Sequence, residues 1–479
     1  MPSPDSSFVD FAPRPTARAT IIILVGFAAT CLASGGSTPS GLAHNYALGT
    51  GLSFATSLLA DYRGNIRNLV RADIMALSSL YFLTLAEFLV PQPEFDTQMG
   101  SLNVQPALYA CVLGFAALAV GRHYSPRPPD SLMRLTRLEP RPQVPIVLFT
   151  LCLVFGYINM LIAVDFDFGV MIDYFMAPRF YQPWGRGKFG DWLALLYEVS
   201  MVLYLIPPIA GVVLADRKKF SKFNVGYVAA GFGFTLFYGF TSGTRNIFAT
   251  YLATFLVAYA FAAGRARRKE ILVVVAISGA AMIYATTTML QFREVGFYNY
   301  MHGDQESDHP KDRMHFFVDN NLSVIVALMR VFPEKHDYLG FEIPYLALIR
   351  PIPRAMWPGK PEGMSLSIEE AVGASEGYTL ASTFIGEAYM SGGLFGVILS
   401  GGVLGMIMAW WNHLGSEHNS SFGYLIYASG FFAAVMSMRS LLVFTTAILP
   451  TIVLIVFSNW LIQAGLARQQ RHTVPPPDA

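Results

Sequence analysis

Long apolar stretches alternate with short polar segments along most of this chain. A helix needs about 20 residues to cross roughly 30 Å of hydrocarbon. Stretches that approach this length lie at residues 19–35, 43–60, 72–91, 105–121, 144–164, 191–215, 224–241, 246–264, 271–290, 388–411, 421–438 and 440–464. This pattern predicts an all-α polytopic membrane protein with about twelve transmembrane helices. We expect residues 1–479 to form a single integral membrane domain.

The composition supports a membrane protein and excludes several other classes. Charged residues make up 14% of the chain and hydrophobic residues 53%, whereas soluble domains have about 25% charged residues. A net charge of +1 argues against a nucleic-acid-binding protein, which would need a basic face. The three cysteines lie inside apolar stretches, without disulfide or zinc spacing. No phosphate-binding or dinucleotide-binding motif is present, so we predict no cofactor and no metal.

The distribution of Arg and Lys predicts the orientation in the membrane. Four basic loops fall on the same side of the proposed topology as both termini, and the positive-inside rule makes that side cytoplasmic. Residues 291–387 then face the periplasm or the cell exterior, as does a shorter loop at residues 165–190. The basic residues of the four loops are Arg63, Arg67 and Arg71; Arg122, Arg127, Arg134, Arg137 and Arg141; Arg217, Lys218, Lys219 and Lys222; and Arg265, Arg267, Arg268 and Lys269.

The long polar segment at residues 291–387 is predicted to fold and to carry the active site. It mixes charged residues with Trp, Phe, Tyr and Leu, which argues against disorder. Apolar residues from Leu322 to Phe332 recur at helical spacing, which predicts a helix that lies at the membrane surface or dips into it. Prolines between Pro344 and Pro361 then break the backbone into turns.

Arginines on the predicted outer side run against the positive-inside trend and are therefore candidates for binding an anionic substrate. The planar guanidinium makes paired, charge-assisted hydrogen bonds to phosphate. Any one of these residues could instead reach to lipid headgroups or pair with Glu294, Glu362 or Glu387, but as a set they favour a shared anion site. The candidate cations are Arg179, Arg245, Arg293, Arg350, Arg354, Lys360 and Arg439.

A general base within reach of the substrate would have to be His, Asp or Glu. Glu387 is the first candidate, because it lies where the chain re-enters the membrane after the long loop. His315 is the second, with Asp319 one helical turn later to orient it. The simpler alternatives are a glutamate that caps a helix and a histidine that makes a local hydrogen bond.

Three motifs in the second half of the chain resemble the Wzy-type O-antigen polymerases, also called oligosaccharide repeat-unit polymerases. They are Gly243-Thr-Arg245, the Pro-Arg-x-x-Trp-Pro-x-Lys-Pro run at residues 353–361, and the Gly-Glu-x-Tyr-x-x-x-Gly element at residues 386–393. The first half matches the family only in topology. The family's Arg-x10-Gly spacing fits Arg179 to Gly190 but is not reproduced in the long loop.

The resemblance implies a membrane glycosyltransferase with a GT-C-like fold, which polymerises undecaprenyl-diphosphate-linked oligosaccharide repeat units on the periplasmic face of the bacterial inner membrane. The reaction would be inverting and metal-independent, and its product would be O-antigen, capsule or exopolysaccharide. The outer cations would bind the diphosphate, and Glu387 or His315 would activate the acceptor. Tyr181, Trp184 and Trp357 would stack on sugars. Membrane lipid, a chain-length regulator and a flippase are the implied partners, and nucleic acid is not.

Two other functions remain open from the sequence. A ligase of related architecture would move a finished glycan onto lipid A core, and the sequence separates it poorly from a polymerase. A transporter or flippase of lipid-linked glycans would show internal repeats and charges near the bilayer midplane. We see no clear repeat, and the apolar stretches are nearly free of charge except at their ends.

Overall fold

Helices are the only regular elements in the part of the chain that the structure describes, which confirms the all-α prediction. The structure is a computed structural model of residues 1–479. It describes residues 11–33, 35–100, 102–179, 181–184, 192–264, 267–293, 295–303, 321–352, 356–361, 363–373, 380–415 and 420–473.

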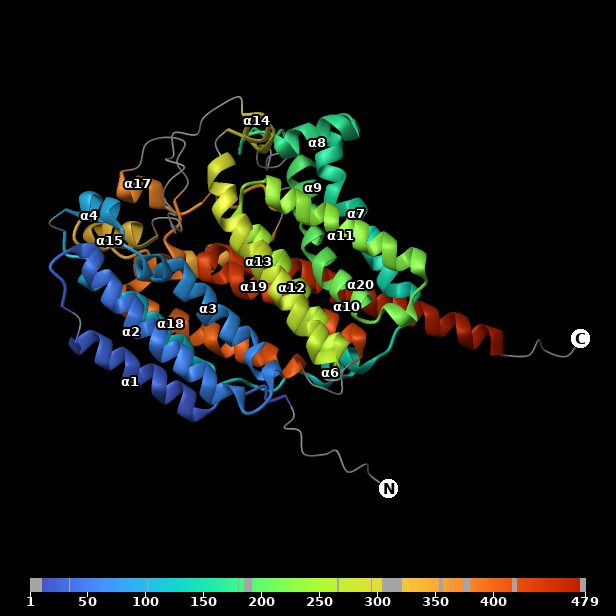
Figure 1. The fold of residues 1–479 in the computed structure, drawn as a ribbon, viewed down its shortest axis with the longest axis horizontal. Helices are drawn as coiled ribbons and strands as arrows, with labels where there is room; N and C mark the ends of the chain where they lie inside the picture. Colours follow the sequence, from blue (N-terminus) through green and yellow to red (C-terminus); the bar gives the residue numbers. More distant parts are fainter. Residues whose placement is uncertain are drawn as a thin grey trace, which may run out of the picture. The chain divides into compact units, whose positions relative to one another are not determined.

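Every apolar stretch predicted from the sequence coincides with a helix or a run of helices (Figure 1). These are α1 (Ala17–Ala33), α2 (Pro39–Tyr62), α3 (Ala72–Thr84) with η2 (Ala86–Leu89), α5 (Gln105–Gly121), α7 (Gln143–Ala163), the run α9 (Trp192–Ser200), η3 (Met201–Leu205) and α10 (Ile206–Ala215), α11 (Lys222–Thr241), α12 (Arg245–Ala263), α13 (Arg268–Phe292), α18 (Thr383–Asn412), α19 (Ser421–Arg439) and α20 (Leu441–Thr473).

Seven segments in the described residues are long and apolar enough to cross a membrane, as expected for a multi-pass membrane protein. They are Gln143–Ala163, Leu196–Ala215, Arg245–Ala263, Arg268–Met289, Thr383–Gly415, Ser421–Arg439 and Leu441–Leu461. Helices α1, α3 and α5 are apolar but shorter, and the 13 residues of α3 span only about 20 Å. The total of about twelve spans therefore stays a prediction.

The chain divides into two compact units. Unit 1 comprises Met1–Pro128, His315–Glu417 and Ala433–Ala447, and unit 2 comprises Pro129–Met314, His418–Phe432 and Ile448–Ala479. In unit 1, α18 packs against α5 and α3, and α1 packs against α2 and α5. In unit 2, α10 packs against α12, α11 and α7, and α12 packs against α13.

Glycines allow α5 and α18 of unit 1 to approach closely. A Cβ added at Gly121 would overlap the carbonyl of Gly402, and one added at Gly405 would overlap the carbonyl of Leu118. Small residues at such contacts let helix backbones pack against each other in membranes, where the hydrophobic effect between helices is weak. This contact makes α18 a central element of unit 1.

The long polar segment forms several short helices. They are α14 (Phe297–His302) in unit 2, and α15 (Asn321–Val331), α16 (Glu342–Ile349) and α17 (Ile368–Val372) in unit 1. The predicted helix at Leu322–Phe332 is confirmed as α15, and its predicted place at the membrane surface or dipping into it stays a prediction. Residues Asn321–Val326 are all buried, because α15 packs against α3, α5, α17 and α18. Most of α15 is therefore internal to unit 1, with Arg330 exposed in its last turn.

Helix α18 is interrupted at Gly392 and Gly393. Gly393 has φ +62° and ψ −148°, a conformation that only glycine adopts readily. The carbonyl of Met390 accepts a hydrogen bond from the N–H of Leu339 at 2.8 Å, and that of Ser391 accepts one from the N–H of Gly340 at 2.9 Å. The segment between α15 and α16 thus satisfies backbone groups that the interruption releases, as a membrane protein requires.

Substitution of Gly393 by Ala should destabilise the protein by about 1–3 kcal/mol, because of the backbone conformation. The added Cβ would also lie 2.7 Å from the Tyr338 hydroxyl. Gly392→Ala is the matched control, since its φ of −171° is extended and nothing lies within 4 Å of an added Cβ. Thermal unfolding of the purified protein in detergent measures both, and equal losses of stability would contradict this account.

Candidate functional site

Glu387, the first candidate base, is 3% exposed and caps the N-terminus of α20. Its Oε1 accepts a hydrogen bond from Ser440 Oγ at 2.6 Å, and its Oε2 accepts bonds from the N–H groups of Leu441 and Leu442 at 2.6 and 3.3 Å. The first N–H groups of a helix have no partner inside the helix, and they favour a negative charge. Glu387 therefore caps a helix, as the simpler alternative proposed. The capped helix is α20, whereas Glu387 itself lies in α18.

One predicted cation interacts with this carboxylate, and two others lie on adjoining segments of unit 1. Arg350 follows α16 and interacts electrostatically with Glu387. Lys360 Nζ donates hydrogen bonds to the carbonyls of Arg350 and Ile352, both at 2.9 Å, and so clamps the turn that carries Arg350. Arg439 ends α19 and immediately precedes Ser440. The structure therefore brings Glu387, Arg350, Lys360 and Arg439 to the same end of unit 1.

Three other predicted cations lie on neighbouring backbone segments of unit 2. The N–H of Arg179 donates a hydrogen bond to the carbonyl of Arg293 at 3.1 Å. Gly243 lies against Arg293, since a Cβ added to it would be 3.5 Å from the Arg293 Cα. Arg245 begins α12 two residues later, so the predicted short turn is confirmed. This group lies at the end of unit 2 where α8 (Phe168–Met176) and α14 are in contact (Figure 1).

The predicted sugar-contacting aromatic residues differ in accessibility. Trp184 is 9% exposed, with its ring 5.6 Å from Phe175, and it hydrogen-bonds Tyr238. Tyr181 is 73% exposed, so its ring is available to a ligand. Trp357 is half-buried, and its carbonyl accepts a hydrogen bond from the Lys360 N–H at 3.1 Å. Tyr181 and Trp357 thus remain better candidates for sugar contact than Trp184.

Two predicted site residues, His315 and Arg354, lie outside the described residues. The structure therefore gives no position for the second candidate base or for the arginine of the Pro-Arg-x-x-Trp-Pro-x-Lys-Pro run. The remaining predicted cations form the two groups described above, one in each unit.

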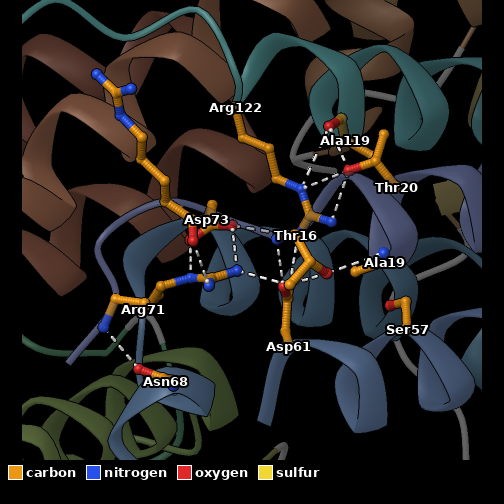
Figure 2. Close-up of polar contacts among 12 residues, drawn as sticks. Thr16, Ala19, Thr20, Ser57, Asp61, Asn68, Arg71, Asp73, Ala119 and Arg122 are labelled. Atoms are coloured by element: carbon orange, nitrogen blue, oxygen red, sulfur yellow. Dashed lines mark hydrogen bonds and ion pairs between the residues drawn. The ribbon is translucent and has the colours of Figure 1, made fainter. Parts of the chain in front are cut away.

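Unit 1 also contains a buried charge network that the sequence did not predict (Figure 2). Arg71 Nη2 lies 2.7 Å from Asp61 Oδ2, and Arg71 Nε lies 3.0 Å from Asp73 Oδ1. Arg122 Nη1 lies 3.4 Å from Asp61 and 3.2 Å from Asp73. All four side chains are 0–1% exposed. The assignment of Arg71 and Arg122 to basic loops is corrected, since both lie buried at helix ends.

Neutral polar groups complete this network. Asp61 Oδ1 accepts hydrogen bonds from the N–H and the hydroxyl of Thr16 at 2.7 and 3.1 Å. Arg122 Nη2 donates to Thr20 Oγ1 at 2.9 Å (Figure 2). Asn412, the last residue of α18, donates to Asp73 at 2.6 Å. The network thus joins α1, α2, α3, α5 and α18 at one end of unit 1.

The network is balanced in charge, so its chemistry favours a structural role. Burial alone lowers the pKa of Arg71, but the adjacent Asp73 and Asp61 carboxylates raise it above its ordinary value. Burial also lowers the pKa of Arg122, and there the two carboxylates do not raise it back to its ordinary value. A guanidinium is not deprotonated in proteins, so both arginines stay charged, and each carboxylate is paired and hydrogen-bonded. The sequence did contain a signal for this network, because Asp61, Arg71 and Asp73 lie close together at the ends of apolar stretches. No group of three His, Cys, Asp or Glu among the described residues could hold a metal ion.

Glu198 is a further acidic side chain that the sequence analysis passed over. It lies inside the candidate span Leu196–Ala215, and its Oε2 is buried. Ionisable residues inside membrane spans are costly and usually have a function. The apolar stretches are therefore less free of charge than the sequence pattern indicated.

These features define a multi-pass helical membrane protein with cationic groups at helix ends. Residues 280–464, which include Glu387 and Arg439, match a family described as a domain of unknown function, DUF8712. The match covers less than half of the chain. No curated protein and no solved structure matches the chain.

Removal of one charge from the network should be strongly destabilising, because the partner charge stays buried without compensation. We expect Asp73→Asn and Asp61→Asn each to cost about 3–5 kcal/mol. The control is Glu139→Gln, which breaks a pair with Lys219 at 2.9 Å in which Glu139 is 53% exposed. That change should cost less than about 1 kcal/mol. Denaturant unfolding in detergent compares them, and a wild-type stability for Asp73→Asn would refute the structural role.

Proposed function

We propose that this protein is a membrane glycosyltransferase that polymerises undecaprenyl-diphosphate-linked oligosaccharide repeat units on the periplasmic face of the bacterial inner membrane. The proposal rests most on one observation, the buried Glu387 carboxylate that interacts with Arg350 and bonds Ser440, the residue after Arg439. This group lies within the segment whose motifs resemble the Wzy-type polymerases. In this proposal both termini are cytoplasmic and residues 291–387 face the periplasm.

The proposed reaction needs cations and a base. A hydroxyl of the acceptor sugar attacks the anomeric carbon of the donor, and the bond from that carbon to the diphosphate oxygen breaks. Arg350, Lys360 and Arg439 would stabilise the charge that develops on the leaving diphosphate. The hydroxyl proton passes to a carboxylate, for which Glu387 is our first candidate. A carboxylate has about four acceptor positions, and three hydrogen bonds to Glu387 leave one for the acceptor hydroxyl.

The second cationic group fits a reaction between two lipid-linked substrates. A polymerase of this kind handles a growing chain and a new repeat unit, and each carries its own diphosphate. Arg179, Arg245 and Arg293 lie on neighbouring backbone segments of unit 2 and are candidates for the second diphosphate. A ligase that transfers glycan to lipid A core needs one polyprenyl diphosphate site, so two cationic groups favour the polymerase.

A flippase for lipid-linked glycans is the second candidate, and specific observations favour it. Transporters place binding sites at interrupted helices. Helix α18 is broken at Gly392 and Gly393, and the span Leu196–Ala215 contains a 3-10 turn followed by Pro207 and Pro208. Equal accessibility of labelled lipid-linked glycan from both faces of proteoliposomes would favour the flippase over the polymerase.

Variants of Glu387 separate catalysis from helix capping. Glu387→Gln retains a carbonyl oxygen for the α20 N–H groups and an amide that can bond Ser440, so the fold should persist. Loss of the base should nevertheless lower chain extension by about 100- to 10,000-fold. Glu387→Ala should also lose about 0.5–2 kcal/mol of stability with the cap. Polymer ladders from cells and thermal unfolding test both variants, and normal ladders from Glu387→Gln would show that Glu387 only caps α20.

Arg245→Lys tests whether a guanidinium is needed in unit 2. Lysine keeps the charge but loses the planar fork that binds phosphate with two hydrogen bonds. We expect chain extension to fall by about 10- to 100-fold, since one charge-assisted hydrogen bond contributes about 1.5–3 kcal/mol. Arg134→Lys in the exposed last turn of α6 (Asp130–Arg137) is the control and should have no effect. Equal ladders from both variants would argue against a phosphate-binding role for Arg245.

A further inference from the structure

A cavity of about 290 Å³ opens in unit 1 beside the interruption of α18. It lies at the end of α5 opposite the buried charge network, because Gln105 begins this helix and Arg122 follows its last residue. None of the proposed cations or acids lines it. Its walls include Asn103, Gln105, Tyr109, Met329, Tyr389 and Leu394.

One buried polar group lies in the chain between two residues of the cavity wall, Tyr389 and Leu394. Ser391 Oγ is buried and has no hydrogen-bond partner among the described residues. Gly392, the next residue, has nothing within 4 Å of an added Cβ. Leu394, two residues further, is part of the cavity wall.

The polar groups of the cavity are held in place before any ligand binds. Tyr389 donates a hydrogen bond to the carbonyl of Phe332 at 3.4 Å, and its ring lies 6.0 Å from that of Tyr338. The side chain of Gln105 hydrogen-bonds the hydroxyl of Tyr46. Asn103 Oδ1 accepts a hydrogen bond from the N–H of Gln105 at 3.0 Å. Preorganised groups reduce the entropy cost of binding.

We propose that this cavity binds one uncharged sugar ring. Two amides and two phenols supply both donors and acceptors, as a ring of hydroxyl groups needs. Met329, Leu394 and the tyrosine rings supply apolar surface for the carbon face of the sugar. No charged side chain is among the described residues of the wall, which favours an uncharged ligand there. A volume of this size is near the lower limit for ligand cavities, on the order of 300 Å³, which suits a single ring.

The place of the cavity on α18 indicates what the bound sugar does. Tyr389 is two residues from Glu387, so the two side chains point about 200° apart around the helix. The sugar in the cavity therefore lies away from the proposed reacting bond. If the proposed polymerase function holds, on which this role rests, the cavity selects the repeat unit and does not take part in the reaction.

Binding of simple glycosides to the purified full-length protein tests the proposal. The protein is placed in phosphatidylcholine nanodiscs, and saturation-transfer NMR is recorded with methyl glucoside, methyl galactoside and N-acetylglucosamine. Glycerol serves as the surrogate for a hydroxyl-rich lipid headgroup. We expect at least one sugar to bind, and glycerol to bind much more weakly. Glycerol signals equal to those of the sugars would assign the cavity to lipid headgroups and overturn the proposal.

Two variants locate the binding. Leu394→Trp fills the cavity from an exposed position, and Gln105→Leu removes an amide at the first residue of α5. Gln105→Leu should weaken sugar binding by about tenfold or more, as the loss of one or two hydrogen bonds predicts. Leu394→Trp should weaken it at least as much, because the indole takes up the space of the sugar ring. Gln143→Leu is the matched control, because Gln143 is likewise the first residue of its helix but lies in unit 2. The proposal would be refuted if the wild-type protein bound no sugar. It would also be refuted if Leu394→Trp bound sugar as well as the wild type does.

The assay separates this proposal from the proposed function. Glycoside binding needs neither a lipid carrier nor turnover. Normal polymer ladders together with no glycoside binding would count against the cavity alone. Glycoside binding at the cavity, without chain extension from lipid-linked repeat units, would count against the polymerase alone. Thermal unfolding of each variant shows whether a loss of binding reflects a loss of folding.

Discussion

The buried pairing of two arginines with two aspartates is the interaction on which the first unit depends most. Arg71 and Arg122 cannot lose their charge at any physiological pH, so each must keep a carboxylate within reach. Asp61 and Asp73 are buried as well, so each of these carboxylates in turn needs an arginine within reach. Because these residues end or begin α2, α3 and α5, and Thr16 and Asn412 add α1 and α18, one electrostatic constraint sets the position of five helix ends.

The opposite end of the same unit obeys a related constraint on backbone groups. An interrupted membrane helix releases N–H and C=O groups that water cannot reach in a bilayer. The N–H groups of Leu339 and Gly340 bond the carbonyls released at the break in α18. The Glu387 carboxylate bonds the free N–H groups at the start of α20. Order at this end therefore comes from polar contacts that also bring a carboxylate and cations together. These are the residues on which the proposed site for phosphate and hydroxyl chemistry rests.

In the proposed function, the two cationic groups and the neutral cavity would bind different parts of the substrate. Cations recognise diphosphate wherever they lie, without regard to the sugar attached. The described wall of the cavity beside α18 has no charged side chain, so a ligand bound there would be recognised by its hydroxyl groups and ring shape. Anchoring of the carrier and selection of the glycan would then rest on different side chains. Such a separation would let the sugar specificity change during evolution while the reacting groups stay the same.

The sequence by itself determined the helices and much of the candidate chemistry. Periodic apolar stretches are a local signal, so every predicted stretch coincides with a helix, and the turns at Arg245 and Arg439 lie where expected. The contact of Arg179 with Arg293 and the capping of α20 by Glu387 join residues more than 50 positions apart, and no local pattern reports them. The sequence also placed Arg71 and Arg122 in loops, because basic residues after apolar stretches resemble exposed loop charges. Only the tertiary structure decided that aspartates from other helices pair with them, since burial of a charge depends on which partner the fold brings to it.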